Sequence, residues 1–176
     1  CGVSLRACLK AMMRFGLPPE RYWPYEEQRF RREPGGFAYG FHRALRRCLY
    51  VKLDHRKQSG DVTLRLVRSF LAAGFGCVCG FPLPATISSS PDIFFPVSRD
   101  ETRDGHAVFI VGYADHRWVR SEKGALLVVN SWGPTWGENG FGWLPYAYVE
   151  DRLAVDFWTL HRRRWIQSGE FSRPLF

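Results

Sequence analysis

The 176-residue sequence lacks several features that would assign it to whole classes of protein. It has no run of about 18 apolar residues, so no membrane-spanning helix is predicted. Lysine is scarce: it supplies only four of the 25 basic residues, and the net charge of +8 therefore comes mostly from arginine. No nucleic-acid-binding motif and no ladder of spaced aromatic residues accompanies the arginine clusters. We therefore expect a solvated basic surface and no nucleic-acid partner.

Cysteine is present in an odd number and at irregular spacing: Cys1, Cys8, Cys48, Cys77 and Cys79. The sequence has no CxxC pair and no zinc-ligand spacing with histidine, so neither a metal nor a cofactor is expected. Cys77 and Cys79 lie two residues apart in a predicted strand, which favours packing of both on one buried face. The odd number favours free, buried thiols in a reducing compartment such as the cytoplasm.

Two short apolar runs, residues 107–111 and 125–129, are predicted to be buried strands because they are rich in β-branched residues and bounded by glycine. His106 begins the first run and Asn130 follows the second. If the two strands are neighbours in a sheet, these side chains meet. The asparagine amide then accepts a hydrogen bond from one ring nitrogen and leaves the other free to act as a base.

The stretch from Asn130 to Gly140 is the most specific pattern in the chain. It reads Asn-Ser-Trp-Gly-x-x-Trp-Gly-Glu-x-Gly, and the Gly-His-Ala-Val around His106 is followed by Val-Gly-Tyr. In these motifs the sequence resembles the papain-like cysteine peptidases. The resemblance implies that His106 is the catalytic histidine, that Asn130 orients it, and that Trp132 shields their hydrogen bond. Residues 2–25 also resemble the helix and loop that follow the catalytic helix in the bacterial branch of the family.

The segment that carries the nucleophile in this family is not found. The resemblance implies a cysteine at the N-terminus of a long helix, with a glutamine just upstream that helps to bind the oxyanion. The chain has only three glutamines, and none precedes a suitable cysteine. Cys1 precedes a helix and stands in the correct order before His106 and Asn130, but the residues after it match the family's second helix. No nucleophile is identified, and Cys1 is retained only as a secondary candidate.

Three explanations fit a missing nucleophile: it lies on a separate chain after cleavage, it lies in sequence removed by truncation, or the protein is a non-catalytic relative. Loss of the central helix would expose the apolar faces of the helix at 2–16 and of the sheet. We therefore expect an N-terminal segment or a second chain to supply that helix. Secretion and disulfides stay open, because secreted members of the resembled family carry them.

The predicted fold is α+β and papain-like. A partial helical lobe is expected over residues 1–57, an antiparallel β-barrel-like lobe carrying His106 and Asn130 over 58–160, and a basic C-terminal tail over 161–176. The other predicted elements are helices at 2–16 and 61–74, strands at 50–53, 77–81 and 155–160, a polar turn at 114–117, and loops at 26–40 and 82–102.

The predicted function is thiol-dependent hydrolysis of peptide bonds in a peptide or protein substrate, with His106 as general base and acid. The chain alone is expected to be inactive. The alternative is a peptide-binding or regulatory protein that keeps the substrate cleft without the chemistry. The loop at 82–102 either borders that cleft or is a plain surface excursion.

Overall fold

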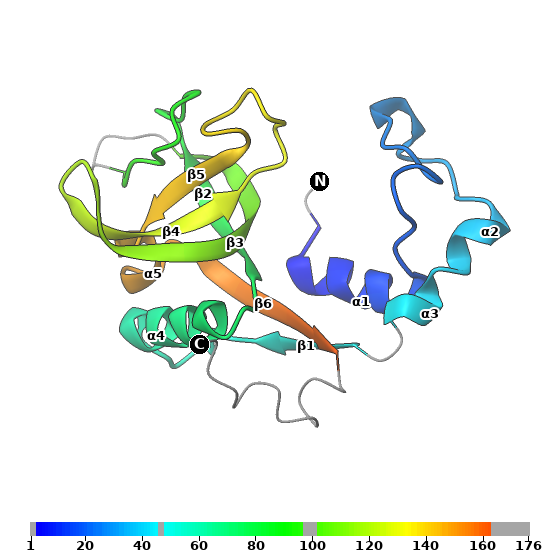
Figure 1. The fold of residues 1–176 in the computed structure, drawn as a ribbon, viewed down its shortest axis with the longest axis horizontal. Coiled ribbons are helices and arrows are strands. Elements are labelled where there is room, and N and C mark those ends of the chain that lie inside the picture. The colour runs from blue at the N-terminus through cyan, green and yellow to red at the C-terminus, as the bar shows by residue number, and fades with distance from the viewer. Residues whose placement is uncertain (1–2, 46–47, 97–101, 163–176) are drawn as a thin grey trace. The chain divides into compact units, whose positions relative to one another are not determined.

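The computed structural model describes residues 3–45, 48–96 and 102–162, and the chain divides into two compact units. Cys1–Tyr50 with His161–Phe176 form one unit, and Val51–Leu160 form the other (Figure 1). The lobe boundary expected at Lys57 stays a prediction. The expected C-terminal tail lies outside the described residues from residue 163 onward.

The first unit begins with α1 (Leu5–Phe15), which lies within the helix predicted at 2–16. The Ser4 hydroxyl accepts a hydrogen bond from the backbone N–H of Ala7 at 3.2 Å, which caps the helix. Gly16 ends it at φ 89°, and any larger residue there would collide with the backbone of His42.

Three short helices follow α1, and two of them lie where the sequence predicted only a surface loop. They are η1 (Glu27–Arg29), α2 (Gly36–Tyr39) and α3 (His42–Leu45). The rings of Tyr22, Phe37 and Phe41 contact one another with centroids 5.3 to 5.5 Å apart. This aromatic cluster stabilises a segment whose charge and glycine content alone favour a loop.

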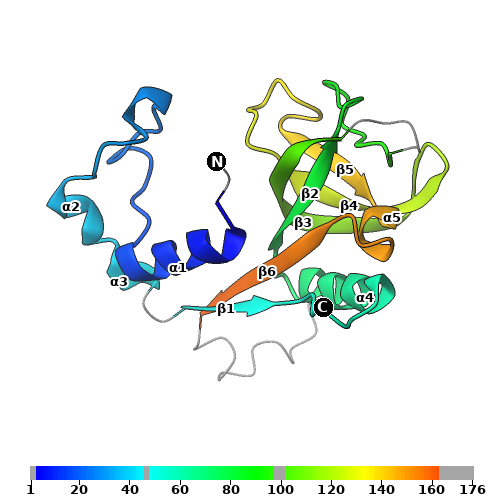
Figure 2. The same cartoon turned by 180° about the vertical axis from the view of Figure 1, so that it is seen from behind.

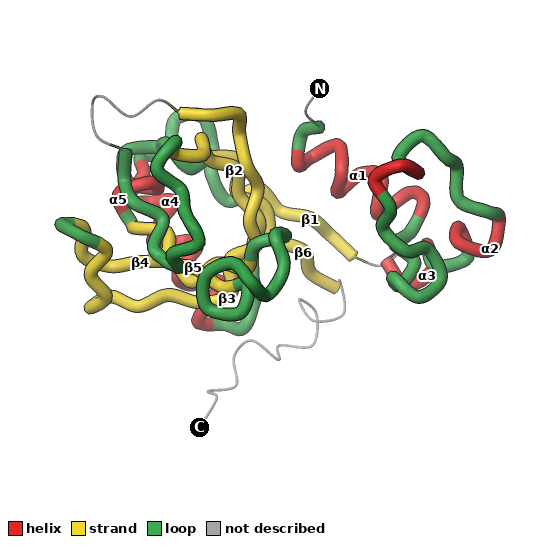
Figure 3. The backbone as a smooth tube through the Cα atoms, turned by 90° about the horizontal axis from the view of Figure 1, so that it is seen from above, coloured by secondary structure: helices red, strands yellow, loops and turns green. Residues whose placement is uncertain are grey.

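Most of a six-stranded sheet lies in the second unit, in the order β1-β6-β2-β3-β4-β5. Antiparallel pairing joins β6 to β2, β2 to β3, β3 to β4 and β4 to β5. Figure 3 shows the strands in yellow, and their bounds are β1 Cys48–Lys52, β2 Cys77–Pro84, β3 Thr102–Val119, β4 Glu122–Val129, β5 Phe141–Pro145 and β6 Val155–Arg162. Helices together with an antiparallel sheet confirm the predicted α+β class.

The core lies between one face of this sheet and α4 (Gly60–Ala72), which packs against β2, β3 and the short helix α5 (Ala147–Glu150) (Figure 2). Val67 of α4, Ile110 of β3 and Val128 of β4 are fully buried. Burying each such side chain contributes about 1.5–3 kcal/mol. None of the helices in the described residues is long and apolar enough to cross a bilayer.

The opposite face of the sheet is also apolar, but it is partly open to solvent. Val78, Phe109, Val129 and Phe141 are successive cross-strand partners from β2 to β5. They alternate with the core residues along each strand, so they lie on the outer face. The exposed fraction is 48% for Phe109 and 37% for Phe141.

The polar turn predicted at 114–117 is wrong, because β3 continues to Val119 and the chain reverses at Arg120, whose φ is 53°. The pairing of β3 with β4 shifts register between Ala114 and Trp118, so the polar residues form a bulge. Asp115 and Arg117 in that bulge form ion pairs with Arg68 and Asp92, each at 2.8 Å. Periodicity alone does not distinguish such a bulge from a turn.

A first prediction concerns Gly60, the first residue of α4. An added Cβ there would overlap the backbone carbonyls of Val149 and Glu150 in α5. We expect Gly60→Ala to lower the free energy of unfolding by about 2 kcal/mol, as overpacking does elsewhere. Gly36→Ala is the matched control: Gly36 also begins a helix, and nothing lies within 4 Å of its added Cβ. Urea unfolding followed by circular dichroism measures both variants, and equal stability of the two would contradict the prediction.

Candidate active site

The sheet brings His106 and Asn130 together. Phe109 of β3 is the cross-strand partner of Val129 of β4, so the residue after Val129 reaches the strand segment that holds His106. His106 Nε2 lies 2.9 Å from Asn130 Oδ1. Asn130 is buried, with 8% of its surface exposed. The contact expected from the sequence is present, and the catalytic roles of the two residues stay predictions.

The orientation of the Asn130 amide fixes the proton on the imidazole. The backbone N–H of Ser131 donates to Asn130 Oδ1 at 2.8 Å, so this atom is the carbonyl oxygen. A carbonyl oxygen only accepts, and therefore Nε2 of His106 donates. In the neutral ring Nδ1 is then the nitrogen with a free lone pair, which is the requirement for a base.

Aromatic rings enclose the imidazole on two sides. The Trp132 indole lies over the His106 ring, with centroids 4.9 Å apart and planes inclined by 37°. Phe81 of β2 approaches edge-on at 6.0 Å. The Trp132 ring lies where the sequence expects a group that shields the hydrogen bond to Asn130, and that shielding role stays a prediction. We call the Trp132 indole the Trp132 lid.

The Gly-rich turn between β4 and β5 sets the position of the lid. Gly133, Gly137 and Gly140 all adopt positive φ, which tightens the chain as other residues rarely can. The backbone N–H of Asn130 donates to Gly140 O at 2.9 Å, and the N–H of Gly140 donates to Trp136 O at 2.8 Å. The turn therefore folds back on itself and holds Asn130 and both indoles at one end of the sheet.

Sequence reasoning missed Phe81 as a neighbour of His106, although it assigned Phe81 to a strand. The pairing that places Phe81 opposite His106 depends on the register of β2 against β3. Register follows from tertiary packing, and no residue near Phe81 signals it.

The cysteines of the second unit do not fit the role of nucleophile. Cys77 and Cys79 are fully buried, and desolvation raises the pKa of both thiols, that of Cys77 to about 12. In the first unit, Cys8 is exposed, so the expectation of a buried thiol there is wrong, and Cys48 is half-buried. Cys1 lies outside the described residues.

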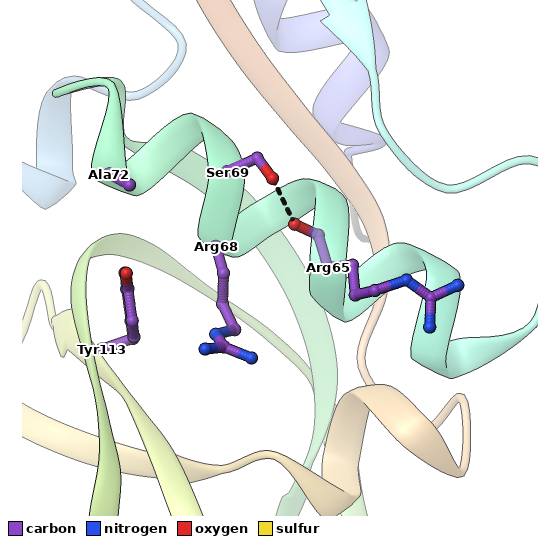
Figure 4. Close-up of a pocket in the computed structure, with 5 residues that line it drawn as sticks. All are labelled: Arg65, Arg68, Ser69, Ala72 and Tyr113. Atoms are coloured by element: carbon purple, nitrogen blue, oxygen red, sulfur yellow. Dashed lines mark hydrogen bonds between the residues drawn. The ribbon is translucent and has the colours of Figure 1, made fainter.

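A small pocket of about 270 Å³ lies between α4 and β3 and does not involve His106 or Asn130 (Figure 4). Its lining residues are Arg65, Arg68, Ser69, Ala72 and Tyr113. Arg68 is already paired there with Asp115 at 2.8 Å. Within the described residues, no group of three or more His, Cys, Asp or Glu side chains is arranged to hold a metal ion.

Comparison with known proteins identifies the family of this fold and site. Residues 90–150 match the family model described as papain family cysteine protease. Over 166 residues the chain is 30% identical to an uncharacterised peptidase C1-like protein of Acanthamoeba polyphaga mimivirus, a match that covers 90% of this chain and 51% of the viral protein. The chain therefore spans about half the length of that relative.

Two solved structures share the fold. Xylellain, a cysteine protease from Xylella fastidiosa, superposes with a TM-score of 0.72 at 28% identity, covering 90% of this chain and 61% of xylellain. The clostridial cysteine protease Cwp84 superposes with a TM-score of 0.64 at 17% identity, covering 92% of this chain and 41% of Cwp84. The second likeness concerns the fold alone. The chain therefore has the papain-like cysteine peptidase fold, and its residues 90–150 match the model of the papain family.

Proposed function

We propose that this chain supplies the histidine and asparagine of a thiol-dependent peptidase. The observation that carries the proposal is the 2.9 Å contact between His106 Nε2 and Asn130 Oδ1 beneath the Trp132 lid. A fixed Nε2–H leaves Nδ1 as the proton acceptor for a thiol. Nucleophilic catalysis needs this arrangement, in which a third group orients the base.

The chemistry proposed for His106 has two proton transfers. Nδ1 takes the proton of a cysteine thiol, and the thiolate attacks the carbonyl carbon of the peptide bond. The imidazolium then returns the proton to the amine nitrogen as the carbon–nitrogen bond breaks, leaving a thioester. Water hydrolyses the thioester with His106 again as the base. Asn130 keeps the ring in one orientation throughout.

We propose that the thiol comes from an N-terminal segment or a second chain. Cys77 and Cys79, the two cysteines of the second unit, are buried and their pKa values are raised. Next to His106 on β3, the outer face presents the exposed side chains of Ala107, Phe109 and Val111. An exposed apolar surface of this kind, on the strand that carries His106, suits a packed helix.

A second observation supports an added segment at this site. Asn130 Nδ2 is buried and has no hydrogen-bond acceptor among the described residues. A buried donor without a partner costs about 1–3 kcal/mol. An acceptor from the segment that carries the thiol would remove this cost.

The histidine tautomer can be tested on this chain by itself. We expect long-range ¹H–¹⁵N spectra to show the Nε2–H form of His106, with a slowly exchanging proton. Asn130→Ala should speed exchange of that proton at least about tenfold, because the acceptor and its shielding are lost. Trp132→Ala should speed exchange while keeping the tautomer. A predominant Nδ1–H form in the native protein would contradict the assigned base.

Reactivity toward a peptide that carries an electrophilic epoxide tests the peptidase itself. We expect no adduct on this chain alone, and one adduct per molecule on the product of the complete reading frame, or on this chain with its partner chain. His106→Ala should abolish labelling, and Asn130→Ala should slow it by about 10- to 100-fold. If the complete protein binds peptides but never forms an adduct, the protein is a peptide-binding relative without the chemistry.

Alkylation separates the buried thiols from a nucleophile. With a pKa of about 12, roughly one Cys77 side chain in ten thousand is a thiolate at pH 8. We therefore expect iodoacetamide at pH 8 to modify Cys8 in the native chain and to reach Cys77 and Cys79 only after unfolding. The thiol of an unfolded chain ionises at a pH of about 8.5, whereas Cys77 in the folded chain stays protonated until the pH approaches 12. The folded state therefore has its full stability below a pH of about 8.5 and loses stability as the pH rises from there toward 12. Rapid native modification of Cys77, detected by peptide mass spectrometry, would contradict its burial.

A further inference from the structure

The Trp132 lid is not fixed by its own burial, because 41% of its surface is exposed. One side of the indole lies on His106, and Trp136 packs against it edge-on at 5.7 Å between ring centroids. Trp136 is buried, with 5% of its surface exposed. The position of the lid therefore depends on what holds Trp136.

Trp136 is held by the loop that follows β2. Its indole Nε1 donates to the carbonyl oxygen of Ser88 at 2.9 Å, and the next backbone N–H, from Gly137, donates to Ser89 O at 3.0 Å. Figures 1 and 2 both show this loop and the turn after β4 at the same edge of the sheet. The segment 88–93 is thus a second support for the site, far from the motif residues in sequence.

The segment 88–93 is itself paired with β5. The N–H of Trp143 donates to Pro91 O at 2.7 Å, and the N–H of Ile93 donates to Trp143 O at 2.9 Å. Gly142 of β5 lies against both the Trp136 ring and the backbone of Pro91. An added Cβ at Gly142 would overlap the Trp136 ring and approach Pro91 O to 2.7 Å. The loop, the β5 backbone and Trp136 are therefore in direct contact.

One ion pair fixes this segment to the sheet from the other side. Asp92 accepts from Arg117 of β3 at 2.8 Å, and the Arg117 guanidinium stacks over the Trp143 ring at 4.5 Å from its centroid. Both side chains are mostly covered, with 31% of Arg117 and 27% of Asp92 exposed. The stacking of Arg117 on Trp143 and its ion pair with Asp92 together hold Asp92 against β5. The backbone of Asp92 also forms an isolated β-bridge with Trp143.

We infer that Asp92 and Arg117 are positioning residues for the Trp132 lid. They fix the segment 88–93, which anchors Trp136, on which the lid packs. A role of the Trp132 lid in catalysis rests on the proposed function. The coupling between the ion pair and the lid does not, because it is a property of this unit's packing. The segment 88–93, which is part of the loop predicted at 82–102, thereby has a supporting role that its sequence does not predict.

The test measures the lid directly in Arg117→Gln, Asp92→Asn and the double variant. Hydrogen exchange of the Trp136 indole proton and of His106 Nε2–H is followed by NMR. We expect each single variant to speed exchange of the Trp136 proton at least fivefold and to speed exchange at His106. The double variant should exchange no faster than the single variants, because both remove one interaction.

Arg68→Gln is the matched control. Arg68 lies beside Tyr113 (Figure 4) and stacks over its ring. It forms an equivalent 2.8 Å ion pair with Asp115, and like Arg117 it has a buried Nε without an acceptor among the described residues. We expect it to leave both exchange rates within twofold of the native values. Equal acceleration in Arg68→Gln and Arg117→Gln would overturn the inference, since the effect would then follow general stability. The epoxide experiment tests the proposed function separately, because the exchange rates of this chain do not depend on whether the complete protein forms an adduct.

Discussion

The hydrogen bond between His106 Nε2 and Asn130 Oδ1 is the constraint on which the rest of the site depends. It requires that two strands pair in one register, because a shift of a single residue would move one of the side chains to the other face of the sheet. It also requires that Asn130 present its oxygen, which the N–H of Ser131 ensures. The core between the sheet and α4 fixes that register, so packing far from the site brings the two side chains within hydrogen-bond distance.

In the proposed function, shielding from water lets this hydrogen bond hold the imidazole in one tautomer. An imidazole in water exchanges its tautomers freely, whereas one beneath an indole and beside Phe81 keeps the form that its partner selects. The lid covers only one side of the ring and is itself partly exposed. Its position therefore depends on the buried Trp136 and on the backbone of the loop that accepts the Trp136 indole proton.

The sequence predicts what depends on local pattern. The helices α1 and α4, the strand segment that follows His106 and the strand that precedes Asn130 all follow from apolar periodicity and its bounding residues. The continuation of β3 through the 114–117 bulge was not predictable in this way, because Asp115 and Arg117 find partners far away in the chain. For the same reason the neighbours of the site, Phe81 and Asp92, carry no local signal: register and long-range ion pairs place them.

The same core that orients the histidine is unsuitable for a nucleophile. Burial fixes an imidazole at little cost when its neutral form is hydrogen-bonded, but it raises the pKa of a thiol, as at Cys77 and Cys79, and so removes the thiolate. A reactive cysteine needs a partly exposed position with positive potential, such as the N-terminus of a helix. In the proposed function the thiol therefore comes from a separate helix, and the exposed side chains of Ala107 and Phe109 on the outer face of the sheet offer an apolar surface against which a helix can pack.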